Sequence, residues 1–406
     1  MTQELVRRIA FTIGALLLYR LGTYIPLPGI NPDIWEQLFR TQQGGILGMF
    51  NMFAGGGLHR MAILALGLLP YWSAAVIIQL LSVVWRGLKS FERSGEAGRR
   101  KIARYTLVLT LLMAGFQAYG IALGLKGAAY VVDNPDGWFV LSATASIVGG
   151  TFFLVWLSEQ ITRHGIGNGL ALIFLAGIAA ELPSALANML ERGRTGAMST
   201  GVILFVIVMA AAVIAFAVFM ESARRNVRIE FAERMIGKRM LPARSAVLPI
   251  KINSAGFLMP TTMLAWIYAL PYLAAVIFGG SQLRLPAAGA VVFGAIALIV
   301  LAFIYTALVI DPEHAAESLH KHGGVIPGVE PGEATAKHLD RVVSLTTVIG
   351  AVYLTAMWLI PTVLLAFGVP FYFSGGTALI LVCTVLDIRT QVRDLSRTNL
   401  MGAEQR

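Results

Sequence analysis

Cysteine and charged residues are scarce in this sequence. Its 406 residues include one cysteine, Cys383, which excludes an intramolecular disulfide and leaves the redox compartment undetermined. Only 13% of the residues are charged, and the mean hydropathy is +0.72. Soluble domains carry about 25% charged residues, so this composition indicates a polytopic membrane protein.

The sequence also lacks the residue patterns that active transporters and nucleotide-using enzymes require. Ion- and proton-coupled transporters keep ionisable groups at membrane depth, whereas the span centres here carry essentially none. Arg20, Glu159, Glu181 and Asp387 lie near span ends, where side chains can reach the membrane interface. There is no GxxxxGK[ST] phosphate loop, so we expect no nucleotide use. The pair His320 and His322 lies in a loop and is expected to be solvated rather than to bind a metal.

Long apolar runs are abundant and predict ten membrane spans. The start of the chain lacks a small-residue cleavage site, so its apolar run is expected to be retained as the first span. With the N-terminus in the cytoplasm, 25 of the 32 lysines and arginines fall on or next to cytoplasmic segments, so both termini are expected to be cytoplasmic. The spans are expected at 8–25, 61–85, 105–124, 138–159, 169–190, 201–220, 254–278, 287–310, 342–366 and 370–387.

The spans fall into two sets of five. An external linker, 191–200, separates an N-terminal half, 1–190, from a C-terminal half, 201–406. An odd number of spans per half makes the second half insert upside down relative to the first, as in inverted repeats with a working site between the halves. The cytoplasmic loops 222–251 and 311–341 are long and charged. They predict docking of a large partner, or they only set the membrane topology.

The stretch from Gly44 to Trp85 does not fit the pattern of plain spans. The apolar run 46–53 is far too short to cross a bilayer, which takes about 20 residues. Three glycines follow it (55–57), and then an apolar span interrupted by Pro70. This order predicts a helix that enters the membrane without crossing it. Such backbone is tolerated only where protein or a water-filled cavity surrounds it.

Uncharged polar residues are the other notable features of the spans. Gln79, Gln117 and Asn253 lie in or at the mouth of spans, where each could simply form an interhelical hydrogen bond. The GIGNG segment, 165–169, is typical of a helix entry whose exposed N–H groups need partners.

Eight segments, in order along the chain, resemble the SecY family of bacterial protein-conducting channel subunits. They are IPLPGIN (25–31), GILGMFNMFAGGGLHR (45–60), ALGLLPYWSAAVIIQLL (65–81), SGEAGRRKIARYT (94–106), GGTFFLVWLSEQITRHGIGNG (149–169), FIYTALVIDP (303–312), PGEATAKHLD (331–340) and VPFYFSGGTALI (369–380).

The resemblance implies an all-α membrane protein with ten helices in two inverted five-helix halves and a re-entrant plug helix at 46–58. It implies a passive, non-enzymatic channel that needs no cofactor, passes unfolded preproteins across the bacterial cytoplasmic membrane, and releases signal sequences and membrane spans sideways into lipid. The implied partners are the small subunits SecE and SecG, and the SecA motor or a ribosome on the cytoplasmic face; DNA is not among them.

The resemblance also assigns roles to residues. The implied pore ring is Leu68, Trp72, Phe174, Thr261 and Leu381, although Leu68 and Phe174 could merely pack the core. The plug would contain Ile46, Leu47, Met49, Phe50, Asn51, Met52, Phe53, Gly55, Gly56 and Gly57. The lateral gate would include Ile78, Gln79 and Asn253. Partner docking is assigned to Arg99, Arg100, Arg234, Lys238, Arg239, Glu330 and Lys337.

Several positions depart from the family pattern. The ring of the family is mostly isoleucine, whereas Trp72 and Phe174 are large and flat and Thr261 is polar. Glu330 and Glu233 stand where the family usually has basic residues. These reversals suggest a diverged or accessory member whose partner carries compensating charges.

Three rival functions are kept open. An inverted-repeat transporter would need ionisable residues in mid-span. An intramembrane protease or acyltransferase would need a nucleophile and a base at depth. A degenerate member of the same family would no longer conduct.

Overall fold

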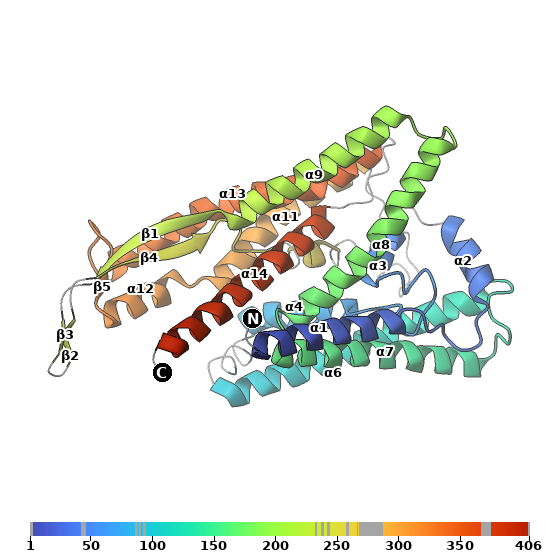
Figure 1. Cartoon of the computed structure of the whole chain (residues 1–406), viewed down its shortest axis with the longest axis horizontal. Helices are drawn as coiled ribbons and strands as arrows, with labels where there is room; N and C mark the ends of the chain where they lie inside the picture. Colours follow the sequence, from blue (N-terminus) through green and yellow to red (C-terminus); the bar gives the residue numbers. More distant parts are fainter. Residues whose placement is uncertain are drawn as a thin grey trace. The chain divides into compact units, whose positions relative to one another are not determined.

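The computed structural model describes residues 3–41, 46–85, 88, 91, 95–231, 234–236, 239–241, 244–256, 260–265, 267, 287–366 and 375–404. These residues are mostly helical (Figure 1). The chain forms two compact units, Met1–Ile203 with Cys383–Arg406, and Leu204–Val382. The predicted division at the linker 191–200 stays a prediction, because these units combine the C-terminal segment with the first part of the chain.

The first unit is built from seven helices within the part of the chain that the structure describes, and from the last part of α14. They are α1 (Gln3–Gly22), α2 (Pro32–Thr41), α3 (Ile46–Phe53), α4 (Leu69–Val84), α6 (Gly95–Gly127), α7 (Gly137–His164) and α8 (Gly169–Arg194). α7 packs on α6, α8 and α1, and α4 packs on α6. α14 (Gly375–Glu404) enters this unit at Cys383.

The second unit contains long apolar helices and a β-ribbon. The helices are α9 (Thr200–Ser222), α11 (Ala287–Val309), α12 (Pro312–Lys321) and α13 (Glu333–Ala366). α13 packs against α11 and α12. The strands are β1 (Arg224–Phe231), β4 (Arg244–Lys251) and the short β5 (Gly324–Val325), with a separate hairpin of β2 (Arg234–Ile236) and β3 (Arg239–Leu241).

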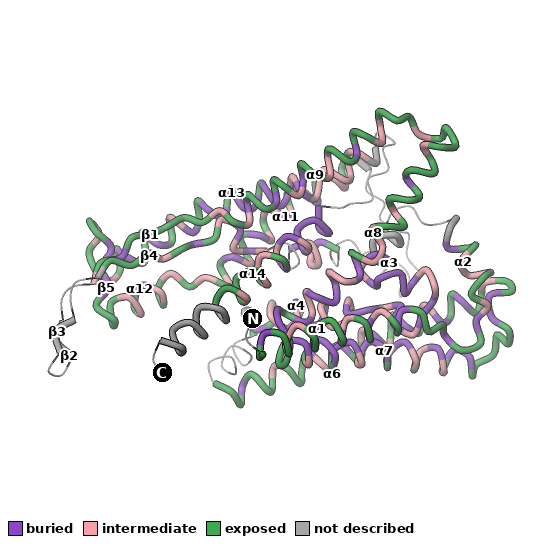
Figure 2. The backbone as a smooth tube through the Cα atoms, in the orientation of Figure 1, coloured by how far each residue is buried: buried purple, intermediate pink, exposed green. Residues whose placement is uncertain are grey.

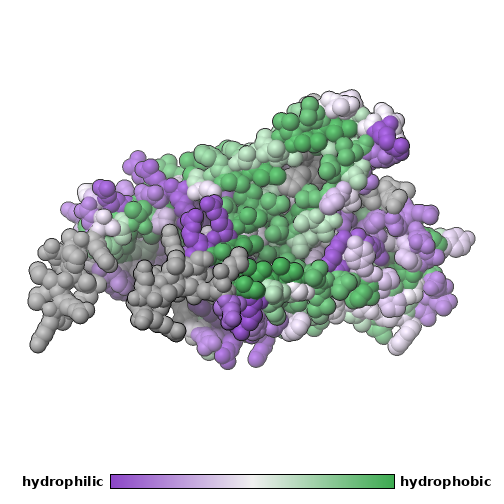
Figure 3. Space-filling model, in the orientation of Figure 1, coloured by the Kyte–Doolittle hydropathy of each residue, from purple (hydrophilic) through white to green (hydrophobic). Residues whose placement is uncertain are grey.

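Most of the predicted apolar spans are confirmed as helices. Seven described helices are long and apolar enough to cross a membrane. Large apolar side chains such as Leu204, Phe219 and Ile296 are exposed, and Figure 3 shows hydrophobic residues along the visible side of α9. Exposed apolar side chains on such helices are expected where lipid is the solvent. Most of the predicted span 254–278 lies outside the described residues.

The predicted span 61–85 is wrong in its first part. α4 begins only at Leu69, and residues 61–68 form turns and one isolated bridge. Pro70 does not kink a longer helix but occupies its first turn, because proline lacks the N–H that a helix start leaves unpaired and its φ already suits a helix.

The long charged loop 222–251, predicted to be cytoplasmic, is largely a β-ribbon rather than an irregular loop. β1 pairs with β4 in antiparallel register, from Arg224 opposite Lys251 to Phe231 opposite Arg244. Val227 and Ile229 alternate with exposed residues, which is the period of two that buries one face of a strand. The buried face packs on Ala316 of α12 and on Leu339 and Val343 of α13.

Side-chain caps explain where several helices begin. Asn31 accepts hydrogen bonds from the N–H groups of Asp33 and Ile34 ahead of α2. Asp311 accepts from His314 ahead of α12, and Asn168 accepts from Leu170 and Ala171 ahead of α8. The GIGNG segment is therefore a helix entry, as expected. Thr12 and Gln391 accept from two of its other N–H groups, those of Ile166 and Gly167.

The segment after α3 is held by short backbone bridges and close packing. Ile25 accepts a hydrogen bond from Ile63, and Leu27 donates one to Met61. Gly150 of α7 faces the Ile63 carbonyl so closely that a Cβ there would overlap it. The neighbouring Gly149 has no atom within 4 Å of its Cβ position. Figure 2 shows that this inner part of the first unit is largely buried.

Two neighbouring glycines allow a matched test of this packing. Gly150→Ala should lower the free energy of unfolding by about 1–3 kcal/mol, because the added methyl group forces the 61–68 segment away from α7. Gly149→Ala should leave stability unchanged or raise it slightly. Thermal unfolding of the purified protein in mild detergent measures both, and equal midpoints would contradict the proposed contact.

Candidate plug, pore and docking surfaces

The predicted plug segment, 46–58, contains the helix α3, Ile46–Phe53, and its role as a plug stays a prediction. Gly55 and Gly56 follow it with φ values of 63° and 78°, a left-handed conformation that glycine adopts without strain. Gly56 donates a hydrogen bond to Asn51, and Ala62 donates one to Gly57, so the chain closes on itself. Residues 54–58 are all buried. The side chains of Ile46, Leu47 and Met49 lie outside the described set.

A cluster of polar side chains surrounds the plug. Arg20 of α1 donates to the Gly55 carbonyl oxygen at 2.6 Å, and Arg60 donates to the same oxygen at 3.5 Å. Arg60 Nη2 lies 3.8 Å from Glu181 Oε1 of α8, and only 28% and 17% of the two side chains are exposed. Asn51 donates to Glu181 at 3.4 Å and accepts from the His59 N–H at 2.7 Å.

The sequence did not single out Arg20, Arg60 and Glu181 as functional. Arg20 and Glu181 were expected to reach the membrane interface from span ends. In the structure both turn toward the plug segment instead. Arg20 donates to the Gly55 carbonyl, which the non-helical turn leaves in need of a partner, and Glu181 accepts from the Asn51 side chain. The only signal in the sequence was that ionisable residues bracket a glycine-rich, non-spanning stretch.

A second contact fixes the chain on the other side of the plug. The Trp35 indole of α2 donates to the Leu58 carbonyl at 3.0 Å. His59 lies 3.7 Å from Glu36 of α2 and packs edge-on against the Phe39 ring. The amphipathic helix α2, which was not predicted, therefore covers the exit of the plug segment.

Three predicted ring residues belong to the first unit. Leu68 and Phe174 are each 1% exposed, and Trp72 lies one turn beyond Leu68 on α4, half-buried. The plug residue Phe53 packs edge-on against Phe174, with ring centroids 5.8 Å apart. Thr261 and Leu381 lie in the second unit and are half-buried. The five-residue ring stays a prediction.

The predicted gate residues likewise divide between the units. Ile78 is buried and Gln79 half-buried on α4. Asn253, in the second unit, is buried and donates from Nδ2 to Glu221 Oε1 at 2.7 Å. Its Oδ1 is buried without a hydrogen-bond partner. The backbone there approaches α13 at Gly350, where a Cβ would come within 2.7 Å of the Ile252 carbonyl.

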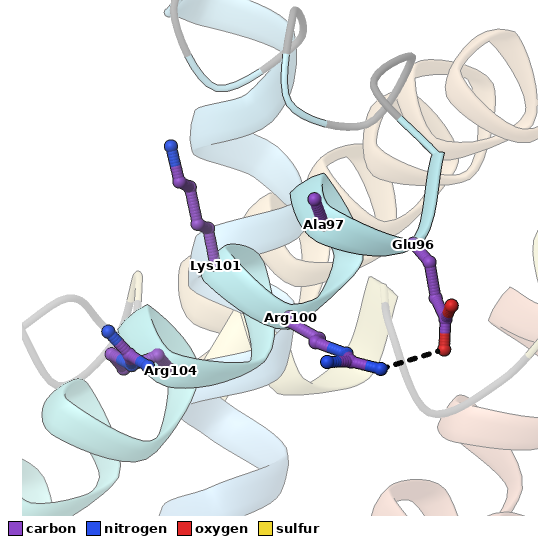
Figure 4. Close-up of a pocket in the computed structure, with 5 residues that line it drawn as sticks. All are labelled: Glu96, Ala97, Arg100, Lys101 and Arg104. Atoms are coloured by element: carbon purple, nitrogen blue, oxygen red, sulfur yellow. Dashed lines mark hydrogen bonds and ion pairs between the residues drawn. The ribbon is translucent and has the colours of Figure 1, made fainter.

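The predicted docking residues Arg99 and Arg100 are exposed on the first turns of α6. Arg100 pairs with Glu96 at 3.1 Å (Figure 4). Lys101 and Arg104 lie on the same turns, and these residues line a shallow cavity of about 530 Å³ with Ala97. Figure 4 shows Lys101 and Arg104 pointing away from the Glu96–Arg100 pair. The Lys101 ammonium lies over the Phe91 ring, 4.7 Å from its centroid.

The second unit contains the remaining predicted docking residues. Lys337 pairs with Glu333 at 2.8 Å on α13, and Glu330 is exposed in the turn before that helix. Arg234 and Arg239 belong to the β2–β3 hairpin, with side chains outside the described set, and Lys238 lies outside it entirely. Arg224, Arg225 and Arg228 are exposed on β1 and were not singled out by the sequence.

Relatives with known names match almost the whole chain. A relative from Escherichia coli (strain K12), named protein translocase subunit SecY, is 44% identical over 97% of this chain and 92% of its own length. The counterpart from Vibrio cholerae is 43% identical over 98% of this chain and 92% of its own.

Solved structures agree with these relatives on the fold. A structure of a protein-conducting channel matches with a TM-score of 0.67 at 17% identity, covering 96% of this chain and 92% of that one. Sec61 in a canine ribosome–channel complex matches with a TM-score of 0.65 at 16% identity, again covering 96% and 92%. The expected count of ten helices is consistent with this fold.

The family model described as SecY matches residues 62–389. This match covers well over half of the chain and includes α4, Phe174 and the β1–β4 ribbon. Together with the identity to named relatives, it shows that this α-helical membrane protein belongs to the SecY family.

Proposed function

We propose that this chain is the protein-conducting channel subunit of a translocase. One observation carries the proposal beyond family membership. An eight-residue helix and the turn after it enter the first unit without crossing it, and buried polar contacts hold them there. A removable stopper of this kind suits a channel that must seal between uses.

The proposed channel is passive. Leu68, Trp72, Phe174, Thr261 and Leu381 would form an apolar constriction that excludes water and ions by dewetting yet yields to a polypeptide. The edge-on contact of Phe53 with Phe174 links the plug to this constriction. Signal sequences and membrane spans would leave sideways past Ile78, Gln79 and Asn253.

The proposed membrane is the bacterial cytoplasmic membrane, with both termini inside. The exposed arginines of β1 and of the first turns of α6 then face the cytoplasm, as the positive-inside rule expects. A motor such as SecA, or a ribosome, would dock there and supply the work. Small membrane subunits, SecE and SecG, would complete the complex.

The rival functions have less support. The SecY family consists of channel subunits rather than enzymes. Arg20, Arg60 and Glu181 contact the plug backbone or each other, so they serve the plug rather than an ion-coupling site. A family member that no longer conducts is distinguished from an active channel only by experiment.

Reconstitution tests the proposed conduction. The full chain with its small subunits in lipid vesicles should import a preprotein when a motor and ATP are added. Protection of the preprotein from external protease measures import. A variant with Phe174→Asp should conduct ions at rest, because a carboxylate wets the apolar constriction. Absence of import by the intact complex, with the motor active on a control translocon, would contradict the proposal.

A charge reversal tests the docking surface. Arg99→Glu with Arg100→Glu should weaken motor binding by about tenfold or more, because two attractions become repulsions at a contact. The matched control, Arg192→Glu with Arg194→Glu, changes the same charge on the expected external side and should leave binding unchanged. Binding isotherms at two salt concentrations measure both, and equal affinities for the two double variants would exclude this docking surface.

A further inference from the structure

The Gly55 carbonyl is a point where three segments of the first unit meet. Arg20 approaches it from α1, Arg60 from the chain beyond the plug, and Gly177 of α8 lies against the same residue. Because Gly55 is buried with a left-handed backbone directly after α3, its oxygen has left the helical hydrogen-bond pattern. A buried carbonyl without a donor is costly, and a guanidinium is the strongest donor that a side chain offers.

The backbone packing at this point is as close as glycine permits. A Cβ on Gly177 would lie 3.1 Å from the Gly55 nitrogen and 3.1 Å from the Met52 carbonyl oxygen. A Cβ on Gly55 would overlap the Tyr19 hydroxyl. Within the described part of the chain that buried hydroxyl has no hydrogen-bond partner, and it packs against Gly55 and Gly177. The plug therefore rests in a seat made by Tyr19 and Gly177.

Two arginines and one glutamate surround the seat, and each has several contacts there. Glu181 lies between Arg60 and Asn51, and both arginines stack over the Tyr24 ring, at 4.8 Å for Arg20 and 4.2 Å for Arg60. Stacking on an aromatic face and pairing with a carboxylate both restrict where a guanidinium can point. Arg20 also donates a hydrogen bond to the Tyr24 hydroxyl at 2.9 Å, so Tyr24 holds its guanidinium in the orientation that reaches the Gly55 carbonyl.

We propose that Arg20, supported by Glu181 and Arg60, is a latch that keeps the plug seated on the Gly55 carbonyl. This proposal rests on the proposed channel function and adds the residues that set how readily the channel opens. When the plug leaves its seat, the Arg20–Gly55 hydrogen bond breaks and Asn51 separates from Glu181. Arg20 and Glu181 are positioning residues, since they act through the plug and need not touch a substrate.

Resting ion conductance of the reconstituted full complex in a planar bilayer tests the latch. Arg20→Gln should raise it about tenfold, because a neutral amide replaces the charged donor. Arg20→Lys, which keeps the charge but not the planar fork, should give an intermediate value. Arg7→Gln is the matched control, because Arg7 lies on the same helix in an exposed pair with Glu4, and it should show no rise.

Two more variants keep the test valid if Arg20→Gln does not fold. Glu181→Gln preserves the shape of the side chain and should also raise the resting conductance. Gly177→Ala should do so by lifting the plug from its seat, whereas Gly149→Ala, with open space around it, should not. Thermal unfolding midpoints identify any variant whose leak comes from general destabilisation.

Deletion of residues 46–57 distinguishes a failure of the proposed latch from a failure of the proposed plug. In that background Gly55 is absent, so Arg20→Gln should add no further conductance. If the deletion raises conductance but Arg20→Gln and Glu181→Gln do not, the proposed latch is contradicted and the proposed plug is retained. If Arg20→Gln raises conductance equally with and without the plug, the latch is also wrong. If the deletion itself causes no leak, the plug role fails and the latch with it.

Discussion

The structure of the first unit depends on satisfying backbone polar groups where the chain is not helical. In a membrane, an unpaired N–H or carbonyl costs several kcal/mol, so irregular backbone must find its partners inside the protein. Residues 54–68 do so through their own turns, through Ile25 and Leu27, and through side chains. Arg20 satisfies Gly55 and Trp35 satisfies Leu58. These same contacts hold the proposed plug in place, so in the proposed channel the hydrogen bonds that satisfy the backbone also keep the pore closed.

Small residues and charged residues hold the plug segment in different ways. Gly150 and Gly177 remove the side chains that would keep the plug segment away from α7 and α8. The charges of Arg60 and Glu181 then act over a short distance in a largely buried setting, where electrostatic interactions are stronger than in water. In the proposed channel, the glycines form the seat of the plug and the charged groups set how readily the plug leaves it.

The second unit presents its charged residues on a β-ribbon. The β1–β4 ribbon buries Val227 and Ile250 against α12 and α13 and leaves Arg224 and Arg228 exposed. A paired ribbon holds its charges in fixed positions, which an irregular loop would not. Glu330 interrupts this basic character in the turn before α13. The exposed charges therefore form a fixed pattern of basic and acidic positions. A proposed partner would be selected by charges complementary to that pattern rather than by its total charge.

The sequence alone determined the class of protein, most spans, the re-entrant helix and the family, because these depend on local apolar runs, caps and ordered motifs. It also contained the caps Asn31 and Asp311, although the helices after them were not predicted. Only the tertiary structure decided that Arg20 and Glu181 turn to the plug, that α2 covers its exit, and that α4 starts at Leu69. Hydrogen bonds between residues 35 or 130 positions apart leave no periodicity in a single sequence, so their partners emerge only when the chain is folded.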